Sequence, residues 1–145
     1  KFSNNSLCDL AVGVDGADNM IKKARLRDTK GVYYQNNIET WNCENKFDII
    51  FSMETFYYFE NVDLVLDKIY NKLLKENSFF IFGIDHYSEN SPSLSWENDI
   101  GIKTKTMSIT KWVYKVKSHG FKNIKYLTWG KKNDWNGTLI ISAFK

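Results

Sequence analysis

The sequence of 145 residues is poor in cysteine, histidine and proline, and it has no long apolar run. Its two cysteines, Cys8 and Cys43, lie far apart without a CxxC spacing. They form no disulfide framework, which predicts a reducing, cytoplasmic setting. His86 and His119 have no further ligands at metal spacing, so no metal site is predicted. No apolar run approaches the roughly 20 residues of a membrane span.

The sequence also has no large excess of one charge: it contains 20 Lys and Arg residues and 17 Asp and Glu residues, a net charge of +3. A nucleic-acid-binding protein usually carries a dense basic stripe, whereas the lysines here are spread along the chain. The nearest approach to a patch is formed by Lys103, Lys105, Lys111 and Lys131-Lys132. A hydrophobic content of 43% is enough for a substantial core, and the length predicts a single domain over residues 1–145.

The stretch from Ala11 to Arg25 has the clearest organisation. Residues 11–15 are an apolar run that ends on Asp15, and a small-residue turn leads into a helical pattern over 18–28. Asp18 is the expected N-cap of that helix, and Lys30-Gly31 its expected stop. In open α/β sheets, ligands bind at the carboxyl ends of strands, where an acid commonly holds ribose hydroxyls. A solvated Asp in a βα turn is the alternative.

The remaining elements follow from periodicity and from turn residues. A polar loop is expected over residues 3–10. Strands are predicted over 32–35, 47–53, 79–84, 121–129 and 138–144, and helices capped by Asn61 and Ser108. The run 47–53 is apolar throughout, which predicts a strand buried on both faces. Residues 86–108 form a long polar segment with the only proline, Pro92, and are predicted to form a lid.

This order predicts an α/β fold with a mostly parallel sheet, closed by an antiparallel pair. Its motifs resemble those of class I S-adenosylmethionine-dependent methyltransferases, which have a Rossmann-like, doubly wound sheet with an antiparallel C-terminal strand. The resemblance rests on three segments and on their spacing: GVDGADNMIKKAR at 13–25, YQNNIE at 34–39 and FDIIFSMETFYYFEN at 47–61. A nicotinamide-binding Rossmann protein also places an acid after its second strand but is a weaker match.

The resemblance implies S-adenosylmethionine as the cofactor and assigns residues to it. Asp15 would accept hydrogen bonds from the ribose hydroxyls, and Gly16 would let the backbone pass close to the adenosine. Met20 would pack on the adenine, while Asn37 and the Ile38 amide would meet its polar edge. Ser52 and Met53 would lie beside the methionine part. Taken singly, Met20 and Met53 are ordinary core residues, and Asn36-Asn37 is a turn.

The catalytic residues are unknown from sequence, but three candidates follow the predicted strands. Glu54 and Tyr57 come after the strand at 47–53, and His86 follows the strand at 79–84. Methyl transfer mainly requires alignment, and it requires a base only if the acceptor must lose a proton. His86 has a surface-loop role as its alternative. The aromatic residues near the expected mouth of the site could form a cage for a cationic amine: Tyr57, Tyr58, Trp96, Trp129 and Trp135. Core and edge packing is the commoner use of such rings, and it is expected for Trp112 and Trp129.

The sequence also departs from the family. Ala17 stands where a capping Ser is common, and no glycine-rich first-strand motif precedes Asp15. That motif would need roughly 20 or more residues before Lys1. We therefore expect a methyltransferase domain that is incomplete at its N-terminus, with a gap in the sheet between the strands at 11–15 and 47–53. Residues 1–145 alone are expected to be unstable or unable to bind the cofactor.

Three functions stay open at this stage. The first is a methyltransferase for a small-molecule acceptor, favoured because basicity is modest and no Asn-Pro-Pro-Tyr-type motif follows the strand at 47–53. The second is an RNA or protein methyltransferase, which clustering of Lys103, Lys105, Lys131 and Lys132 near the acceptor site would favour. The third is a non-catalytic relative that binds ligands. The acceptor and the oligomeric state do not follow from the sequence.

Overall fold

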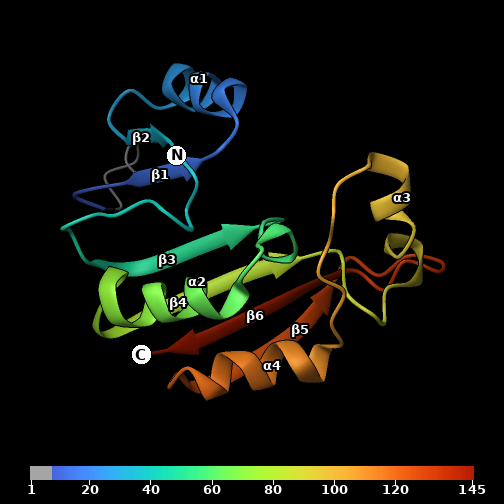
Figure 1. Cartoon of the computed structure of the whole chain (residues 1–145). Coiled ribbons are helices and arrows are strands. Elements are labelled where there is room, and N and C mark those ends of the chain that lie inside the picture. Colours follow the sequence, from blue (N-terminus) through green and yellow to red (C-terminus); the bar gives the residue numbers. More distant parts are fainter. Residues whose placement is uncertain (1–7) are drawn as a thin grey trace. The chain divides into compact units, whose positions relative to one another are not determined.

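The computed structural model describes residues 8–145 and divides into two compact units, residues 1–42 and 43–145 (Figure 1). Of the loop predicted over 3–10, only residues 8–10 are described, and they are irregular; the rest lies outside the described residues. Cys8 and Cys43 are free thiols. Within residues 8–145, no helix is long and apolar enough to cross a membrane.

The first unit is a βαβ arrangement. Strand β1 (Val12–Asp15) runs parallel to β2 (Val32–Gln35), and helix α1 (Asp18–Arg27) connects them. Ile21 on α1 is only 2% exposed, and the Arg25 guanidinium donates to the Tyr33 carbonyl at 2.7 Å. These contacts hold the helix over the two strands, as the apolar pattern of 11–25 predicts.

Both ends of α1 differ from the prediction. Asp18 is the first helical residue rather than the N-cap, because the extended Ala17 takes that position. Asp18 pairs instead with Lys22, one helical turn later, at 2.5 Å. The helix ends at Asp28, whose carboxylate accepts from the amides of Lys30 and Gly31 at 3.0 and 3.1 Å. An Asp side chain therefore ends the helix where glycine was expected to do so.

The second unit contains a sheet with strand order β3-β4-β6-β5. The strands are β3 (Phe47–Met53), β4 (Leu74–Ile84), β5 (Lys122–Trp129) and β6 (Thr138–Phe144). β3 and β4 are parallel, whereas β6 is antiparallel to both β4 and β5. The predicted antiparallel insertion of the last strand is therefore confirmed. Within the described residues, β1 and β3 share no ladder.

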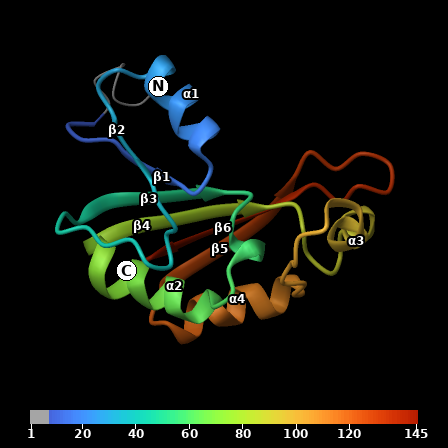
Figure 2. The same ribbon diagram turned by 45° about the horizontal axis from the view of Figure 1, so that its top comes forward.

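Helices α2 (Val62–Lys68) and α4 (Ile109–Ser118) cover one face of this sheet (Figure 2). The core under them is aromatic: the rings of Phe56 and Phe82 stack at 4.5 Å, and Trp112 meets Phe82 edge-on at 5.9 Å. Trp112 is fully buried, as predicted, whereas Trp129 is 74% exposed and does not pack in the core. Trp129 is the last residue of the edge strand β5.

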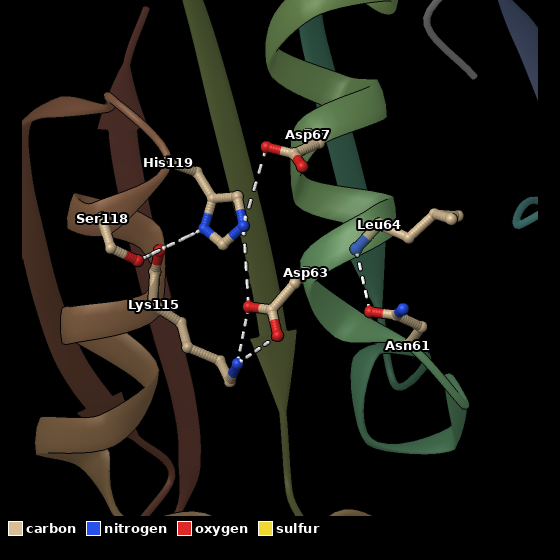
Figure 3. Close-up of polar contacts among 7 residues, drawn as sticks. All are labelled: Asn61, Asp63, Leu64, Asp67, Lys115, Ser118 and His119. Carbon is tan, nitrogen blue, oxygen red and sulfur yellow. Dashed lines mark hydrogen bonds and ion pairs between the residues drawn. The ribbon is translucent and has the colours of Figure 1, made fainter.

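The caps predicted for α2 and α4 are confirmed. The Asn61 side chain accepts from the Leu64 amide at 3.0 Å, and the Ser108 hydroxyl accepts from the Lys111 amide at 3.2 Å. Asp63 on α2 forms an ion pair with Lys115 on α4, with 2.6 Å between Asp63 Oδ1 and Lys115 Nζ (Figure 3). The same oxygen lies 3.5 Å from His119 Nε2. This pair links elements that are far apart in sequence.

Three further elements differ from the prediction. A π-helical turn (Ile69–Leu73) follows α2, and β4 begins at Leu74 rather than at Phe79 because Leu74 already pairs with Phe47. Strand β3 is not buried on both faces: Ile49 and Phe51 are each 61% exposed. They point away from the face that α2 and α4 cover, because alternate residues of a strand face opposite sides.

The long segment after β4 is more structured than predicted. It holds a 3-10 turn (Ser91–Ser93), opened by Pro92, and the short helix α3 (Trp96–Ile100), which ends at Gly101 with a φ of 67°. The Ser95 hydroxyl donates to Asp99 at 2.6 Å across the first turn of α3. Local hydrogen bonds and a glycine C-cap therefore accompany regular structure in a polar stretch that shows no hydrophobic periodicity.

Candidate active site

Five of the seven residues assigned to the cofactor lie in the first unit, at the carboxyl ends of β1 and β2. Asp15 ends β1, and its carboxylate is oriented by the Ala17 amide, which donates to it at 2.7 Å. A side chain at Gly16 would meet nothing within 4 Å. Met20 is 53% exposed, so it is not the ordinary core methionine that was the alternative. The carboxylate of Asp15 and the thioether of Met20 are thus both exposed where β1 leads into α1.

The turn after β2 contains the other two assigned residues of this unit. The Asn37 side-chain oxygen accepts from the Glu39 amide at 2.9 Å, and the Asn37 carbonyl accepts from the Trp41 amide at 2.8 Å. This is the Asx turn that Asn36-Asn37 alone would predict. An amide oxygen has two lone pairs, so Asn37 can hold the turn and still accept from a ligand.

Ser52 and Met53 end β3 in the second unit, and the candidate catalytic residues follow them. Glu54 adopts a φ of 52°, a left-handed conformation that few residues other than glycine adopt. Its amide donates to the Gly83 carbonyl at 2.9 Å, which ties the turn to β4. Strained backbone of this kind is frequent at functional sites.

Glu54 and Tyr57 form a hydrogen-bonded pair. The Tyr57 hydroxyl donates to Glu54 Oε2 at 2.8 Å, and Tyr57 itself is 2% exposed. Burial, together with hydrogen bonding to Tyr58 and Glu54, raises the Tyr57 pKa far above its ordinary value. Tyr57 therefore keeps its proton near neutral pH and positions Glu54 as a hydrogen-bond donor.

Burial is also the main cause that raises the pKa of Glu54. The nearby charge of Asp85 adds to this effect, whereas the hydrogen bonds from Tyr57 and from the Asp85 backbone oppose it. A carboxyl group with a raised pKa is a better base for proton transfer near neutral pH than an exposed one.

His86 lies beside this pair, but both of its ring nitrogens are engaged. Nδ1 lies 2.9 Å from the Ser93 carbonyl, to which it must donate, and Nε2 lies 2.7 Å from the Thr106 hydroxyl. His86 is 1% exposed, so the alternative of a surface-loop histidine is wrong. In this arrangement His86 links two parts of the segment that follows β4, one at Ser93 and one at Thr106.

Two of the three candidates, Tyr57 and His86, belong to an aromatic cluster. The Tyr57 ring lies 5.5 Å from His86 and 6.1 Å from Trp96, and Trp96 stacks on Trp135 at 6.1 Å. The Lys105 amide donates to the Tyr57 carbonyl at 2.7 Å, which holds residues 102–107 against the cluster. Residues from five separate places in the sequence therefore meet near the carboxyl ends of β3 and β4.

Asp85 is the residue that sequence reasoning missed. It follows β4 directly, as Asp15 follows β1, so the same signal, an acid at the end of a buried strand, could have identified it. Its Oδ1 atom and Glu54 Oε1 are both buried, and neither has a hydrogen-bond partner among the described residues. Within residues 8–145, no group of three or more His, Cys, Asp and Glu residues could hold a metal ion.

A family model described as a methyltransferase domain matches residues 3–82, more than half of the sequence. The chain belongs to this methyltransferase family. A comparison with curated protein sequences gives no match. The cofactor of these methyltransferases is S-adenosylmethionine.

Solved structures of methyltransferases share the fold. A chain of the complex between the Haloferax volcanii Trm112 methyltransferase activator and a methyltransferase is 20% identical, with a TM-score of 0.79. A Thermotoga maritima protein described as a possible histamine N-methyltransferase is 17% identical, with a TM-score of 0.76. These two alignments cover 93% and 92% of this chain, and 71% and 72% of the solved chains.

The N-methyltransferase NodS from Bradyrhizobium japonicum, solved with S-adenosylhomocysteine, is 14% identical, with a TM-score of 0.71. Its alignment covers 94% of this chain and 66% of NodS. At these identities the structures establish the fold, a mixed α/β sheet with helices, and they leave the acceptor open.

Asp15 and Gly16, at the end of β1, have the chemistry that a ribose requires. An exposed carboxylate already oriented by a backbone amide, beside an open glycine, suits a pair of ribose hydroxyls. A cavity of about 440 Å³ on the second unit is a separate feature, lined by residues of β4, β5 and β6 such as Phe79, Lys125 and Phe144. It holds none of the candidate residues.

Proposed function

We propose that this methyltransferase acts on a small-molecule acceptor that binds among Glu54, Tyr57, Asp85 and Trp96. The observation that carries the proposal is the buried pairing of Glu54 with Tyr57 at the carboxyl end of β3, enclosed by aromatic rings. Enclosed groups of this kind suit a small ligand, which buries most of its surface when it binds. A polymer would need an open, extended surface.

The cofactor would be held by Asp15, Gly16, Met20, Asn37 and Ile38 at the ribose and adenine, and by Ser52 and Met53 at the methionine part. When bound, it supplies a methyl group on a positively charged sulfur. The protein then has to align the acceptor and exclude water. In this proposal Glu54 touches the acceptor and accepts its proton, Tyr57 positions Glu54, and His86 holds the segment that covers them.

RNA or protein is the second candidate acceptor, and one observation favours it. Lys105 borders Tyr57 through its backbone, and Lys132 pairs with Trp135, whose ring stacks on Trp96. Both lysine groups therefore adjoin the aromatic cluster. Glu97, Asp99 and Asp134 lie in the same stretches, however, so the cluster is not bordered by the dense basic stripe that nucleic acid requires.

The test compares acceptor classes directly. The full-length protein is incubated with S-adenosylmethionine labelled in its methyl group and with small-metabolite, RNA and protein fractions from a cell extract. The proposal expects label in the small-metabolite fraction. Label confined to RNA or protein would support the second candidate, and no transfer to any fraction would support a non-catalytic relative. The cytoplasmic location stays a prediction that cell fractionation can test.

A further inference from the structure

Two carboxylate oxygens in the second unit are buried without a hydrogen-bond partner. Glu54 Oε1 and Asp85 Oδ1 are each inaccessible to solvent. They follow adjacent parallel strands, in a register that pairs Met53 with Gly83. The Glu54 amide donates to the Gly83 carbonyl at 2.9 Å, two residues before Asp85, and the Asp85 charge contributes to the raised pKa of Glu54. The two acids therefore belong to one site.

Among residues 8–145, no Lys, Arg or His forms an ion pair with Glu54 or Asp85. Both ring nitrogens of the neighbouring His86 are instead engaged by the Ser93 carbonyl and the Thr106 hydroxyl. A buried carboxylate oxygen without a hydrogen-bond donor lowers the stability of the folded protein, and repulsion between two neighbouring carboxylates lowers it further. A ligand with positive charge and N–H donors would remove both penalties.

The surrounding side chains suit such a ligand as well. The Tyr57 and Trp96 rings lie 6.1 Å apart at an interplanar angle of 61°, and Trp135 extends the aromatic surface beyond Trp96. Aromatic faces attract cations, most strongly where water is excluded. Phosphate or carboxylate ligands would meet two acids here and would be repelled.

We propose that the methyl acceptor is a cationic amine, whose ammonium group is held between the carboxylates of Glu54 and Asp85. This inference rests on the proposed function, a small-molecule acceptor, and specifies its chemical class. One N–H proton passes to the Glu54 carboxylate, which becomes a carboxylic acid. The freed nitrogen lone pair then forms the new N–CH3 bond as the S–CH3 bond breaks. The products are the methylated ammonium ion and S-adenosylhomocysteine, with the sulfur now neutral.

The experiment uses the full-length protein and matched sets of candidate acceptors. Each primary or secondary amine is paired with an alcohol and a carboxylic acid of the same carbon skeleton, and methyl transfer is measured with labelled cofactor. The inference expects transfer to amines at least about a hundredfold faster than to their alcohols, and none to the acids. Equal use of alcohols, or preference for acids, would overturn the inference and leave the small-molecule function intact. Label found only in RNA or protein would overturn both.

Three variants test the roles of the acids. Glu54→Gln should lower kcat by about a hundredfold or more, because it removes the proton acceptor while keeping the size and shape of the side chain. Asp85→Asn should mainly raise KM for the amine. Glu60→Gln, at an exposed glutamate outside the site, should change neither.

Folding is checked separately, so that a misfolded variant does not count as support. Each variant must bind S-adenosylhomocysteine with an unchanged Kd before its kinetics are interpreted. If Glu54→Gln fails this check, the pH profile of the unaltered protein replaces it: kcat should rise with pH through a single ionisation as Glu54 loses its proton. Full activity of a folded Glu54→Gln variant would contradict the inference.

Discussion

The two units of the methyltransferase differ in how their candidate functional residues are held in place. In the first unit, the proposed cofactor residues are exposed and are oriented by short-range hydrogen bonds, such as those of Asp15 to Ala17 and of Asn37 to Glu39. In the second unit, Glu54, Tyr57 and His86 are brought together from distant stretches. A local motif can therefore specify the cofactor residues, whereas the acceptor site depends on the packing of the whole unit.

The largest expected effect comes from the core of the second unit. Trp112→Ala removes a fully buried ring that packs on Phe56 and Phe82, and it should lower the free energy of unfolding by about 3–5 kcal/mol. Denaturant unfolding followed by circular dichroism measures this loss. The matched control is Trp129→Ala, whose ring is 74% exposed and whose loss should cost less than about 0.5 kcal/mol. Equal effects of the two would contradict the packing described for α4.

The next effect concerns the cofactor residues of the first unit. Asp15→Asn replaces the carboxylate with a neutral amide and should weaken S-adenosylhomocysteine binding by about tenfold to a hundredfold, the value of a hydrogen bond to a charged group. Isothermal titration calorimetry on the full-length protein measures the change. Asp18→Asn is the control, because Asp18 lies on the same turn but pairs with Lys22 at the surface. Unchanged binding by Asp15→Asn would remove Asp15 from the cofactor site.

A smaller effect should appear in the pH dependence of stability. Burial raises the folded-state pKa of Glu54 above its unfolded value, so between those two values the folded protein binds more protons than the unfolded chain. Stability should therefore fall as pH rises from the ordinary Glu pKa through the raised one. Glu54→Gln should remove this part of the slope. A profile that is identical with and without Glu54 would show that the carboxyl group is not perturbed.

The smallest effect is expected where α2 meets α4. Asp63 is about half exposed, so its pairing with Lys115 is screened by solvent, and Asp63→Asn should cost no more than about 1 kcal/mol. The loss should shrink in high salt, because ions screen exposed pairs. Thermal unfolding at low and high salt measures it. A loss as large as that of Trp112→Ala would mean that charge, rather than packing, fixes these helices.

Local sequence signals predicted most of the strands correctly. The bounds of β2, β3 and β6 match the predictions, because each is an apolar or β-branched run closed by turn residues. Helix ends were less predictable. Asp18 has the residue type of an N-cap, yet the backbone places Ala17 there, while the Asp28 side chain ends the helix through contacts with residues that follow it.

The acceptor site was predicted only in part. Glu54, Tyr57 and His86 were candidates because they follow strands, and the structure does group them. Their different roles depend on neighbours that no local pattern reveals: Asp85 beside Glu54, and Ser93 and Thr106 at the two ring nitrogens of His86. Proton affinity depends on burial and on nearby charge, and both follow from long-range packing.

The sequence by itself determined the class of fold, the βαβ turn that carries Asp15 and the order of the strands. Hydrophobic periodicity and turn residues act over a few residues, so they can be recognised without any tertiary contact. Only the tertiary structure decided that Ile49 and Phe51 are exposed, that Trp129 is not a core residue and that one carboxylate oxygen each of Glu54 and Asp85 is buried. Those properties depend on which surfaces meet, and they arise when distant segments of the chain pack together.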